Sequence, residues 1–308
     1  MTRFVQLLLL LLAALPASAQ DDGLTPGTLT FANVERSYWL HVPAELPEAA
    51  PLVLALHPRF GDGPSMAEHT GFNAIADREG FIVAYPDGIA GEWNFIRGVP
   101  GYPNPLDDVA FLTALVGAIA EVYPVDPARV YVAGFSNGGF MAQRIACEAP
   151  GPFAAFASVA ASGFGGMLDV CLEPEIAPAP MLLIHGTADD NVPWEGNGVT
   201  RGDVTVYVTY PVPNTLAYWA EFNGCQPDSE IEDLPTSRLS PGTSVRILRV
   251  DCPANASVVL YMIQGGGHNW PSPTRDAYSG SGLINHDIDA TEEVWSFFAA
   301  HALEATSE

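Results

Sequence analysis

Four short apolar runs recur along the chain, each bounded by glycine, proline or polar residues. They cover residues 52–56, 130–133, 180–184 and 258–263. Runs of this length, rich in valine, leucine and isoleucine, are typical of strands buried on both faces of a sheet. Residues 111–122 and 216–223 instead show helical patterns. The alternation predicts an α/β fold: a mainly parallel sheet flanked by helices and connected by right-handed crossovers.

No internal repeat or long linker interrupts this alternation. We therefore expect residues 20–308 to form one α/β domain. Residues 228–242, rich in proline, serine and acidic residues, are predicted to be a surface insertion.

The first residues have the pattern of a secretory signal peptide. Arg3 precedes an apolar run over residues 7–12, and Ala17-Ser18-Ala19 is a small-residue cleavage site before Gln20. Residues 1–19 are therefore predicted to be removed on export to the extracellular space or the periplasm. Elsewhere the chain has no apolar stretch of roughly 20 residues, so no transmembrane segment is expected.

A G-x-S-x-G element, Gly134-Phe135-Ser136-Asn137-Gly138, lies between the strand pattern at 130–133 and a helical pattern at 140–146. In this context the motif predicts a nucleophile elbow, a tight turn that exposes its serine at the N-terminal end of a helix. The two glycines leave room for the turn, and the serine is expected to have a strained backbone. Ser136 is therefore the candidate nucleophile.

A serine nucleophile needs a base and an orienting carboxylate, which follow this type of elbow in the order Asp, His. Asp189 and Asp190 come just after the run at 180–184, and Asp189 is favoured as the orienter. His268 follows the run at 258–263 in a glycine-rich loop and is favoured as the base. His185 directly follows an apolar run, so we expect it to be a packed, locally hydrogen-bonded residue.

Acyl transfer also needs backbone donors for the oxyanion. Asn137, the residue after the nucleophile, supplies the first N–H. The second comes from the loop after the run at 52–56, which contains Pro58-Arg59-Phe60. Because proline has no N–H, the donor is Arg59 or Phe60, and we favour Arg59. Their bulky side chains would flank the cleft.

The ordered set of motifs resembles the secreted esterases of the polyhydroxybutyrate depolymerase and feruloyl esterase group, which are α/β-hydrolases. The resemblance covers nearly the whole mature chain and is carried by Leu56-His57, residues 80–88, Trp93-Asn94, residues 107–111, residues 123–131, the elbow, residues 185–189, residues 266–271 and residues 287–290.

This resemblance implies the α/β-hydrolase fold and a triad of Ser136, Asp189 and His268, the same residues that the motifs indicate. It also implies a substrate that is either a hydroxycinnamoyl ester of plant polysaccharide or a polyester such as polyhydroxybutyrate. The chain departs from the family at Pro58-Arg59-Phe60, where glycine usually follows the histidine. That departure affects the expected shape of the acyl pocket and leaves the chemistry unchanged.

Composition excludes several partners. The formal net charge is -24 and the chain has no lysine; removal of residues 1–19, with one arginine, makes the mature charge one unit more negative. Such a polyanion repels phosphates and anionic lipid, so neither nucleic acid nor a membrane is an expected partner. No spacing of metal ligands is present, and no cofactor is expected. We expect a monomer that acts on an ester, either a small molecule or a polymer-linked group.

Four cysteines in an exported chain, with no C-x-x-C pair, indicate disulfides rather than a metal site. Three pairings are possible. We favour Cys147 with Cys171 and Cys225 with Cys252, which close two local segments.

Aromatic residues gather near the predicted site in sequence. Phe60, Trp93 and Trp270 are the candidate substrate contacts, although core packing is the commoner role for such residues. Phe60 lies in the oxyanion loop and Trp270 two residues after the base, so these two have the strongest case.

Three classes of function compete. A secreted serine carboxylester hydrolase is favoured by the ordered triad. A peptidase of the prolyl oligopeptidase type shares the elbow and the His-Gly-x-x-Asp loop, but it usually carries a large N-terminal propeller, and only a few tens of residues precede the first core strand here. A non-catalytic binding protein on the same fold would have no need of an intact triad.

Overall fold

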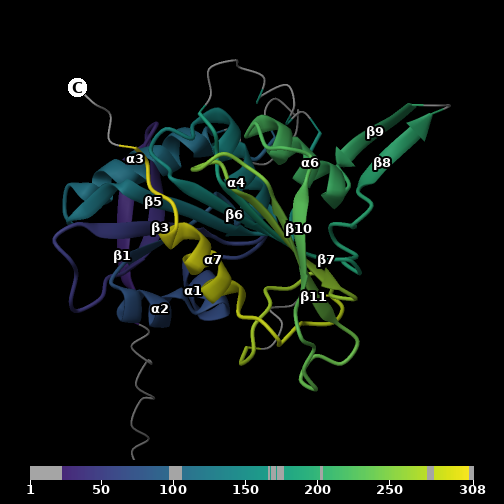
Figure 1. Cartoon of the computed structure of the whole chain (residues 1–308). Coiled ribbons are helices and arrows are strands. Elements are labelled where there is room, and N and C mark those ends of the chain that lie inside the picture. The colour runs from purple at the N-terminus through teal and green to yellow at the C-terminus, as the bar shows by residue number, and fades with distance from the viewer. Residues whose placement is uncertain are drawn as a thin grey trace, which may run out of the picture.

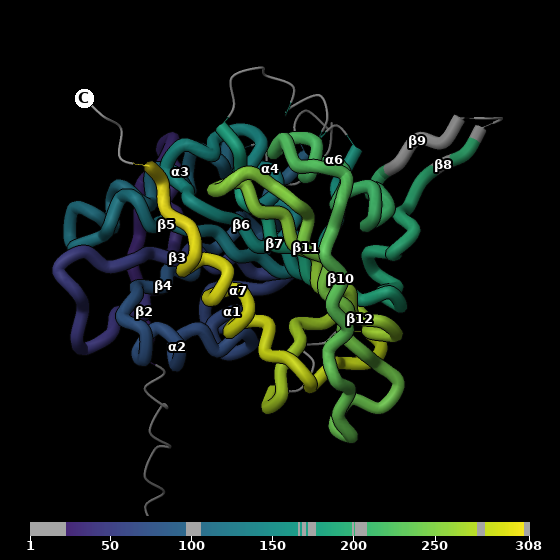
Figure 2. The backbone as a smooth tube through the Cα atoms, in the orientation of Figure 1, coloured from purple at the N-terminus to yellow at the C-terminus, as the bar shows by residue number. Residues whose placement is uncertain are grey.

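The structure is a computed structural model that describes residues 23–96, 106–165, 167, 171, 177–201, 204–275 and 281–304. The predicted signal peptide over residues 1–19 lies outside these residues. Figures 1 and 2 show a central twisted sheet between helices, with a two-stranded hairpin that extends away from it.

Ten of the described strands form one sheet in the order β1-β2-β4-β3-β5-β6-β7-β12-β11-β10. Their bounds are β1 (Thr25–Phe31), β2 (Val34–His41), β3 (Ala50–Leu56), β4 (Ile82–Pro86), β5 (Val125–Phe135), β6 (Ala155–Val159), β7 (Met181–Gly186), β10 (Ser229–Asp233), β11 (Ser244–Val250) and β12 (Val258–Gln264). The six central strands in this order, β4, β3, β5, β6, β7 and β12, pair in parallel. The outer strands pair antiparallel at both edges. The hairpin consists of β8 (Asn197–Arg201) and β9 (Val204–Thr209).

Helices cover both faces of the sheet. They are α1 (Gly63–Thr70), α2 (Phe72–Glu79), α3 (Asp108–Ala120), α4 (Asn137–Glu148), α6 (Val212–Phe222) and α7 (Ala290–Ala299). Apolar residues of α3, α4 and α6 form one core with one face of the strands, and those of α1, α2 and α7 form a second core with the other face (Figure 1). Because both faces are covered, β3, β4, β6 and β7 are buried along their whole length.

The predicted fold class is confirmed: a mainly parallel sheet flanked by helices. The four apolar runs lie in β3, β5, β7 and β12, and the two helical patterns lie in α3 and α6. The observed bounds differ from these patterns by a few residues at either end; α3, for example, both begins and ends earlier than the predicted 111–122.

The prediction for residues 228–242 was incomplete. These residues are exposed for the most part, as expected of a surface insertion, but they include the edge strand β10. Cross-strand ion pairs hold this strand to β11: Arg246 Nε lies 2.6 Å from Asp233 Oδ1, and an Arg249 nitrogen lies 3.6 Å from Glu232 Oε2. An edge strand made of polar residues has no apolar pattern from which it could be recognised.

Both favoured disulfides are present. Cys147 of α4 is bonded to Cys171, and Cys225, just after α6, is bonded to Cys252, just after β11. Each bridge therefore joins segments close in sequence, as the prediction required. None of the described helices has the length and apolar character needed to cross a membrane.

Candidate active site

Ser136 occupies the turn between β5 and α4 in a strained backbone conformation. Its φ of 52° and ψ of -113° lie in a region that residues with a side chain rarely adopt. The serine is the N-cap residue of α4, yet its side chain makes no capping bond, and the residue is half-buried. The hydroxyl is therefore left available at the positive end of a helix.

The two glycines of the elbow are required by close packing. A Cβ on Gly134 would overlap the carbonyl group of Gly138, and a Cβ on Gly138 would overlap the carbonyl oxygen of Leu56 at the end of β3. The backbone N–H of Ser136 donates to the Val159 carbonyl oxygen at the end of β6, at 2.8 Å. Contacts on both sides thus hold the elbow against its two neighbouring strands.

Asp189 and His268 form a direct pair. The Asp189 Oδ2 atom lies 2.8 Å from the Nδ1 atom of His268, and both residues are buried. Since an ionised carboxylate can only accept hydrogen bonds, Nδ1 carries the proton and Nε2 remains the basic nitrogen. The other oxygen, Oδ1, accepts from the backbone N–H groups of Asn191 and Val192 at 2.9 and 2.8 Å.

His268 also lies beside the elbow. Its ring centroid is 5.1 Å from that of Phe135, the residue before Ser136. Its backbone N–H donates to the Ser281 carbonyl oxygen at 2.8 Å, which fixes the glycine-rich loop. The loops that follow the parallel strands β5, β7 and β12 share one edge of the sheet, so the structure gathers all three predicted triad residues there.

His185 is a packed residue, as predicted. It is almost fully buried at the end of β7, and its Nε2 lies 2.9 Å from the Val192 carbonyl oxygen and 3.5 Å from Asp189 Oδ2. Burial lowers the pKa of its imidazole, so the ring is neutral. It braces the loop that bears the orienting carboxylate.

The backbone geometry distinguishes the two candidates for the second oxyanion donor. The Phe60 N–H donates to the Gly91 carbonyl oxygen at 2.7 Å and is not free for a ligand. In the part of the chain that the structure describes, the N–H groups of Arg59 and Asn137 have no acceptor. Arg59 therefore remains the better candidate.

A set of contacts that sequence reasoning missed joins the two donor segments. The Asn137 side chain accepts from the Trp93 N–H at 2.6 Å and donates to the Trp93 carbonyl oxygen at 3.3 Å. The Trp93 indole N–H donates to the His57 carbonyl oxygen at 3.0 Å, and the Gly88 N–H donates to His57 Nε2 at 2.8 Å. Burial lowers the pKa of His57, which suits a neutral acceptor. The position of His57 directly after an apolar run, like that of His185, is the one signal that could have indicated this role.

The structure does not support two of the predicted substrate contacts. Trp93 is fully buried, with its ring against that of His57, and serves as the link just described. Trp270 is also buried; it packs against Phe72 and Phe135 and donates to Thr291 Oγ1 at 2.9 Å. Nearness in sequence to a catalytic residue does not set the direction of a side chain. Phe60, in contrast, is largely exposed.

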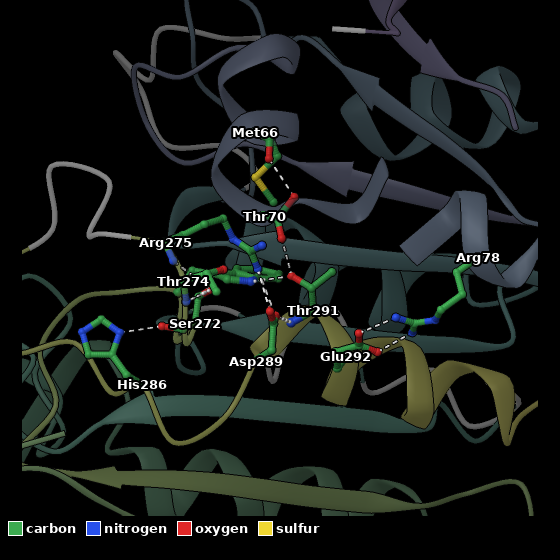
Figure 3. A network of polar contacts seen from close by, with 11 residues as sticks. Met66, Thr70, Arg78, Ser272, Thr274, Arg275, His286, Asp289, Thr291 and Glu292 are labelled. Atoms are coloured by element: carbon green, nitrogen blue, oxygen red, sulfur yellow. Dashed lines mark hydrogen bonds and ion pairs between the residues drawn. The ribbon is translucent and has the colours of Figure 1, made fainter. Parts of the chain in front are cut away.

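Figure 3 shows the polar network that supports the loop after His268. Arg275 contacts both carboxylate oxygens of Asp289 at 3.0 Å, and Asp289 caps α7 by accepting from the Thr291 N–H. The Thr291 hydroxyl donates to the Thr70 carbonyl oxygen at the end of α1, at 2.6 Å. The loop is thereby joined to two helices. Among the described residues, no group of three or more histidine, cysteine or acidic side chains is arranged to hold a metal ion.

Comparisons with known proteins identify the family of the chain. Residues 36–171 match the family described as Esterase PHB depolymerase. A putative esterase, NocK, from Nocardia uniformis subsp. tsuyamanensis is 32% identical over 265 residues, which make up 82% of this chain and 76% of that protein. The chain belongs to the PHB depolymerase esterase family. It is accordingly a carboxylic ester hydrolase of the α/β-hydrolase fold.

Other similarities are more distant. Feruloyl esterase C from Emericella nidulans is 28% identical over 273 residues, covering 86% of this chain and 84% of the relative. Two longer relatives are matched over only part of their length: 40% of feruloyl esterase B from Piromyces equi and 22% of the bifunctional acetylxylan esterase/xylanase XynS20E from Neocallimastix patriciarum. The structure of an acetyl xylan esterase from Aspergillus awamori superimposes with a TM-score of 0.62 at 17% identity, covering 90% of this chain and 99% of that one. That similarity concerns the fold alone.

Proposed function

We propose that this member of the family is a secreted serine carboxylester hydrolase that acts through an acyl-enzyme on hydroxycinnamoyl or short-chain esters. The observation that carries the proposal is the buried 2.8 Å contact between Asp189 and His268, next to an elbow whose serine has a strained backbone. This is the arrangement that activates a serine hydroxyl at neutral pH.

In the proposed reaction, Ser136 Oγ attacks the ester carbonyl carbon while its proton passes to Nε2 of His268. The bond between the carbonyl carbon and the alcohol oxygen then breaks, and the alcohol leaves with that proton. Water attacks the acyl-serine, again losing its proton to His268, and the acid departs as Ser136 is restored. Asp189 keeps Nδ1 protonated throughout and stabilises the imidazolium that forms.

The N–H groups of Arg59 and Asn137 are the proposed donors to the oxyanion. Because the Asn137 side chain holds Trp93, and Trp93 holds the loop of His57, the two donors are fixed relative to one another before substrate binds. A donor of this kind contributes about 10²- to 10³-fold to the rate in enzymes where one has been removed.

Three expectations about the whole protein belong to this proposal. Residues 20–308 act as one catalytic domain, the enzyme is monomeric, and export precedes activity. Two disulfides support an oxidising compartment. The polyester alternative is favoured by one observation, the description of the matching family as PHB depolymerases.

Substitution of the proposed nucleophile and base tests the function. Ser136→Ala and His268→Ala should each remove nearly all hydrolysis of p-nitrophenyl butyrate, and the double variant should be no slower, because both groups act in one step. Ser229→Ala, on the exposed strand β10, is the matched control and should keep full activity. A double variant much slower than either single one would contradict the mechanism.

A substrate panel separates the alternatives. Specific activities on methyl ferulate, p-nitrophenyl butyrate, an amorphous polyhydroxybutyrate suspension and a peptide anilide should be compared at one enzyme concentration. Hydrolysis of the first two without clearing of the suspension supports the proposal. Rapid clearing with no release of ferulate would make the polyester function the better one, and cleavage of the anilide would indicate a peptidase.

A further inference from the structure

The loop after β3 holds an aromatic side chain out into solvent. Phe60 is 74% exposed, and its backbone φ is 64°, in the left-handed region that bulky residues rarely adopt. Both features cost free energy: one exposes a phenyl ring to water and the other strains the backbone. Strain of this kind persists where the surrounding structure enforces it, and it is common at ligand-binding sites.

Contacts with the neighbouring loop fix this backbone. The Phe60 N–H donates to the Gly91 carbonyl oxygen at 2.7 Å, and the Gly61 N–H donates to the Pro58 carbonyl oxygen at 3.0 Å. Gly91 has a φ of 74°, and a Cβ there would come within 3.1 Å of the Phe60 Cα. The two loops therefore lie directly against each other, and Phe60 has little freedom to turn inward.

An ion pair supports the ring from one side. Arg59 Nε donates to Glu92 Oε1 at 2.6 Å, and the carboxylate is buried while the arginine side chain is 61% exposed. The Arg59 guanidinium carbon lies 4.8 Å from the centroid of the Phe60 ring, a cation–π distance. Because a buried carboxylate holds the guanidinium in place, the ring is backed on one face and open on the other.

The loop that bears Phe60 also lies next to the nucleophile elbow. The carbonyl groups of Leu56 and His57 pack against Gly138 of the elbow so closely that a side chain there would overlap them. The Phe60 N–H is bonded to the Gly91 carbonyl oxygen, and Trp93, two residues further on, donates its N–H to the side chain of Asn137, the residue after Ser136. These contacts bring the loop of Phe60 against the elbow, so we expect a group held on Phe60 to lie beside the ester.

We propose that Phe60 is a specificity-determining residue that binds a flat aromatic ring of the ester substrate, with Arg59 and Glu92 as its positioning residues. The inference rests on the proposed function, because it needs the ester to react at Ser136. A phenyl group with one open face stacks with a planar aromatic ring better than with a saturated ring or a linear chain, by about 3- to 10-fold in binding. The rigid loop lowers the entropy lost when the rings stack.

The test compares methyl 3-phenylpropanoate, methyl 3-cyclohexylpropanoate and methyl hexanoate, which share an alcohol and an unconjugated carbonyl. The wild-type enzyme should have the highest kcat/KM for the phenyl ester. In Phe60→Leu, kcat/KM for that ester should fall about 3- to 10-fold, mainly through KM, with less than a twofold change for hexanoate. Leucine keeps a side chain at the positive φ, so the backbone strain is matched, and Phe60→Tyr should restore the preference.

Each other outcome has a definite meaning. An equal loss on all three esters in Phe60→Leu would show that the residue only holds the loop, and an unchanged ratio of phenyl to cyclohexyl ester would show that the ring binds elsewhere; either result overturns the inference alone. If the wild-type enzyme hydrolyses none of the esters, the proposed function fails and the inference fails with it. Gly91→Ala, which would push against the Phe60 backbone, should lower the same phenyl preference.

Discussion

Both oxygens of the Asp189 carboxylate have defined partners. Oδ2 contacts His268 Nδ1, with His185 Nε2 at 3.5 Å, and Oδ1 accepts two backbone N–H groups from its own loop. A carboxylate with all of its neighbours donating is held in one orientation, and it requires one tautomer of the base. The neighbouring Asp190 is exposed and makes no such contacts in the described structure.

Substitution of these two aspartates should therefore have unequal effects. Asp189→Asn can present an amide N–H to His268, which favours the wrong tautomer, and kcat for p-nitrophenyl butyrate should fall by about 10⁴-fold. Asp190→Asn should lower kcat by less than twofold. Steady-state kinetics of both variants, with thermal unfolding as a folding control, make the comparison. The reverse order would assign the orienting role to Asp190.

Four buried histidines give the free energy of unfolding a pH dependence. Burial lowers the pKa of His57, His69, His185 and His301 below 6.5, in the case of His69 to about 4. In the unfolded chain each of these rings would bind a proton near pH 6.5. Between the unfolded and folded pKa values the unfolded state therefore holds more protons, so stability rises with pH and is lost as the pH falls below 6.5.

The expected result is a free energy of unfolding that decreases from pH 7 to pH 5. Each neutral histidine contributes a slope of up to about 1.4 kcal/mol per pH unit below pH 6.5. Urea unfolding at pH 7.5, 6.5, 5.5 and 5.0, at constant ionic strength, measures this. His69→Gln should have a shallower slope. A free energy that stays constant from pH 6.5 to pH 5 would mean that these rings are not held neutral by the fold.

At the scale of single residues, the sequence predicted the catalytic residues whose place depends only on which strand they follow. Asp189 and His268 follow buried strands, and the carboxyl ends of parallel strands share an edge, so their meeting could be predicted. The burial of Trp93 and Trp270 could not be predicted from the sequence. The direction of each indole depends on a partner distant in the chain, His57 for Trp93 and Thr291 for Trp270. Side-chain direction is a tertiary property.

At the scale of elements, the loop that carries His268 depends on two helices that meet behind it. Trp270 donates to the Thr291 hydroxyl at the start of α7. This hydroxyl donates to the Thr70 carbonyl oxygen at the end of α1, as Figure 3 shows. One buried hydroxyl thus satisfies two groups, one from the loop of His268 and one from α1, and links both segments to α7. Its loss would leave a buried indole N–H and a buried carbonyl oxygen without this partner.

Thr291→Val tests the importance of this junction. Valine has nearly the shape of threonine but no hydroxyl, so the free energy of unfolding should fall by about 1–3 kcal/mol. Thr291→Ser keeps the hydroxyl and is the matched control, with a smaller loss. Urea unfolding measures both, and kcat for p-nitrophenyl butyrate shows whether the loop of His268 has moved. Equal stability of the valine and serine variants would show that the hydroxyl is not important.

The elements themselves were predictable in proportion to their burial. β3 and β7 are buried along their whole length, and their sequences are continuous apolar runs. β10 is exposed at all five positions and contains three acidic residues. It is a strand because β11 lies beside it with arginines opposite its acids, a pairing that its own sequence does not contain.

At the scale of the whole molecule, acidic residues greatly outnumber basic ones. The chain has 12 lysine and arginine residues together against 36 acidic ones. Eight arginines in the described part pair with carboxylates: Arg36, Arg59, Arg78, Arg129, Arg144, Arg246, Arg249 and Arg275. Most acidic groups are left without a cation, so the surface repels other anions and the fold carries some self-repulsion.

The two disulfides stabilise the fold and so offset this self-repulsion. The disulfides join residues 24 and 27 positions apart, and closing a loop of this length contributes about 3–4 kcal/mol in the chain-entropy model. The whole free energy of unfolding of a typical domain is only about 5–15 kcal/mol. The two bridges together therefore represent a large part of the stability.

Removal of the bridges should weaken the fold before it affects the chemistry, since neither contains a proposed catalytic residue. The paired variant Cys225→Ser with Cys252→Ser should lose about 3 kcal/mol of unfolding free energy in urea, and a reductant should cause a further loss by opening the second bridge. At 20 °C in the absence of urea, kcat for p-nitrophenyl butyrate should stay within twofold of the wild-type value.

A variant that lacks all four cysteines controls for other effects of the reductant and should not respond to it. An unchanged urea midpoint in the paired variant would show that the bridge contributes little, and the stability would then have to come from the two apolar cores.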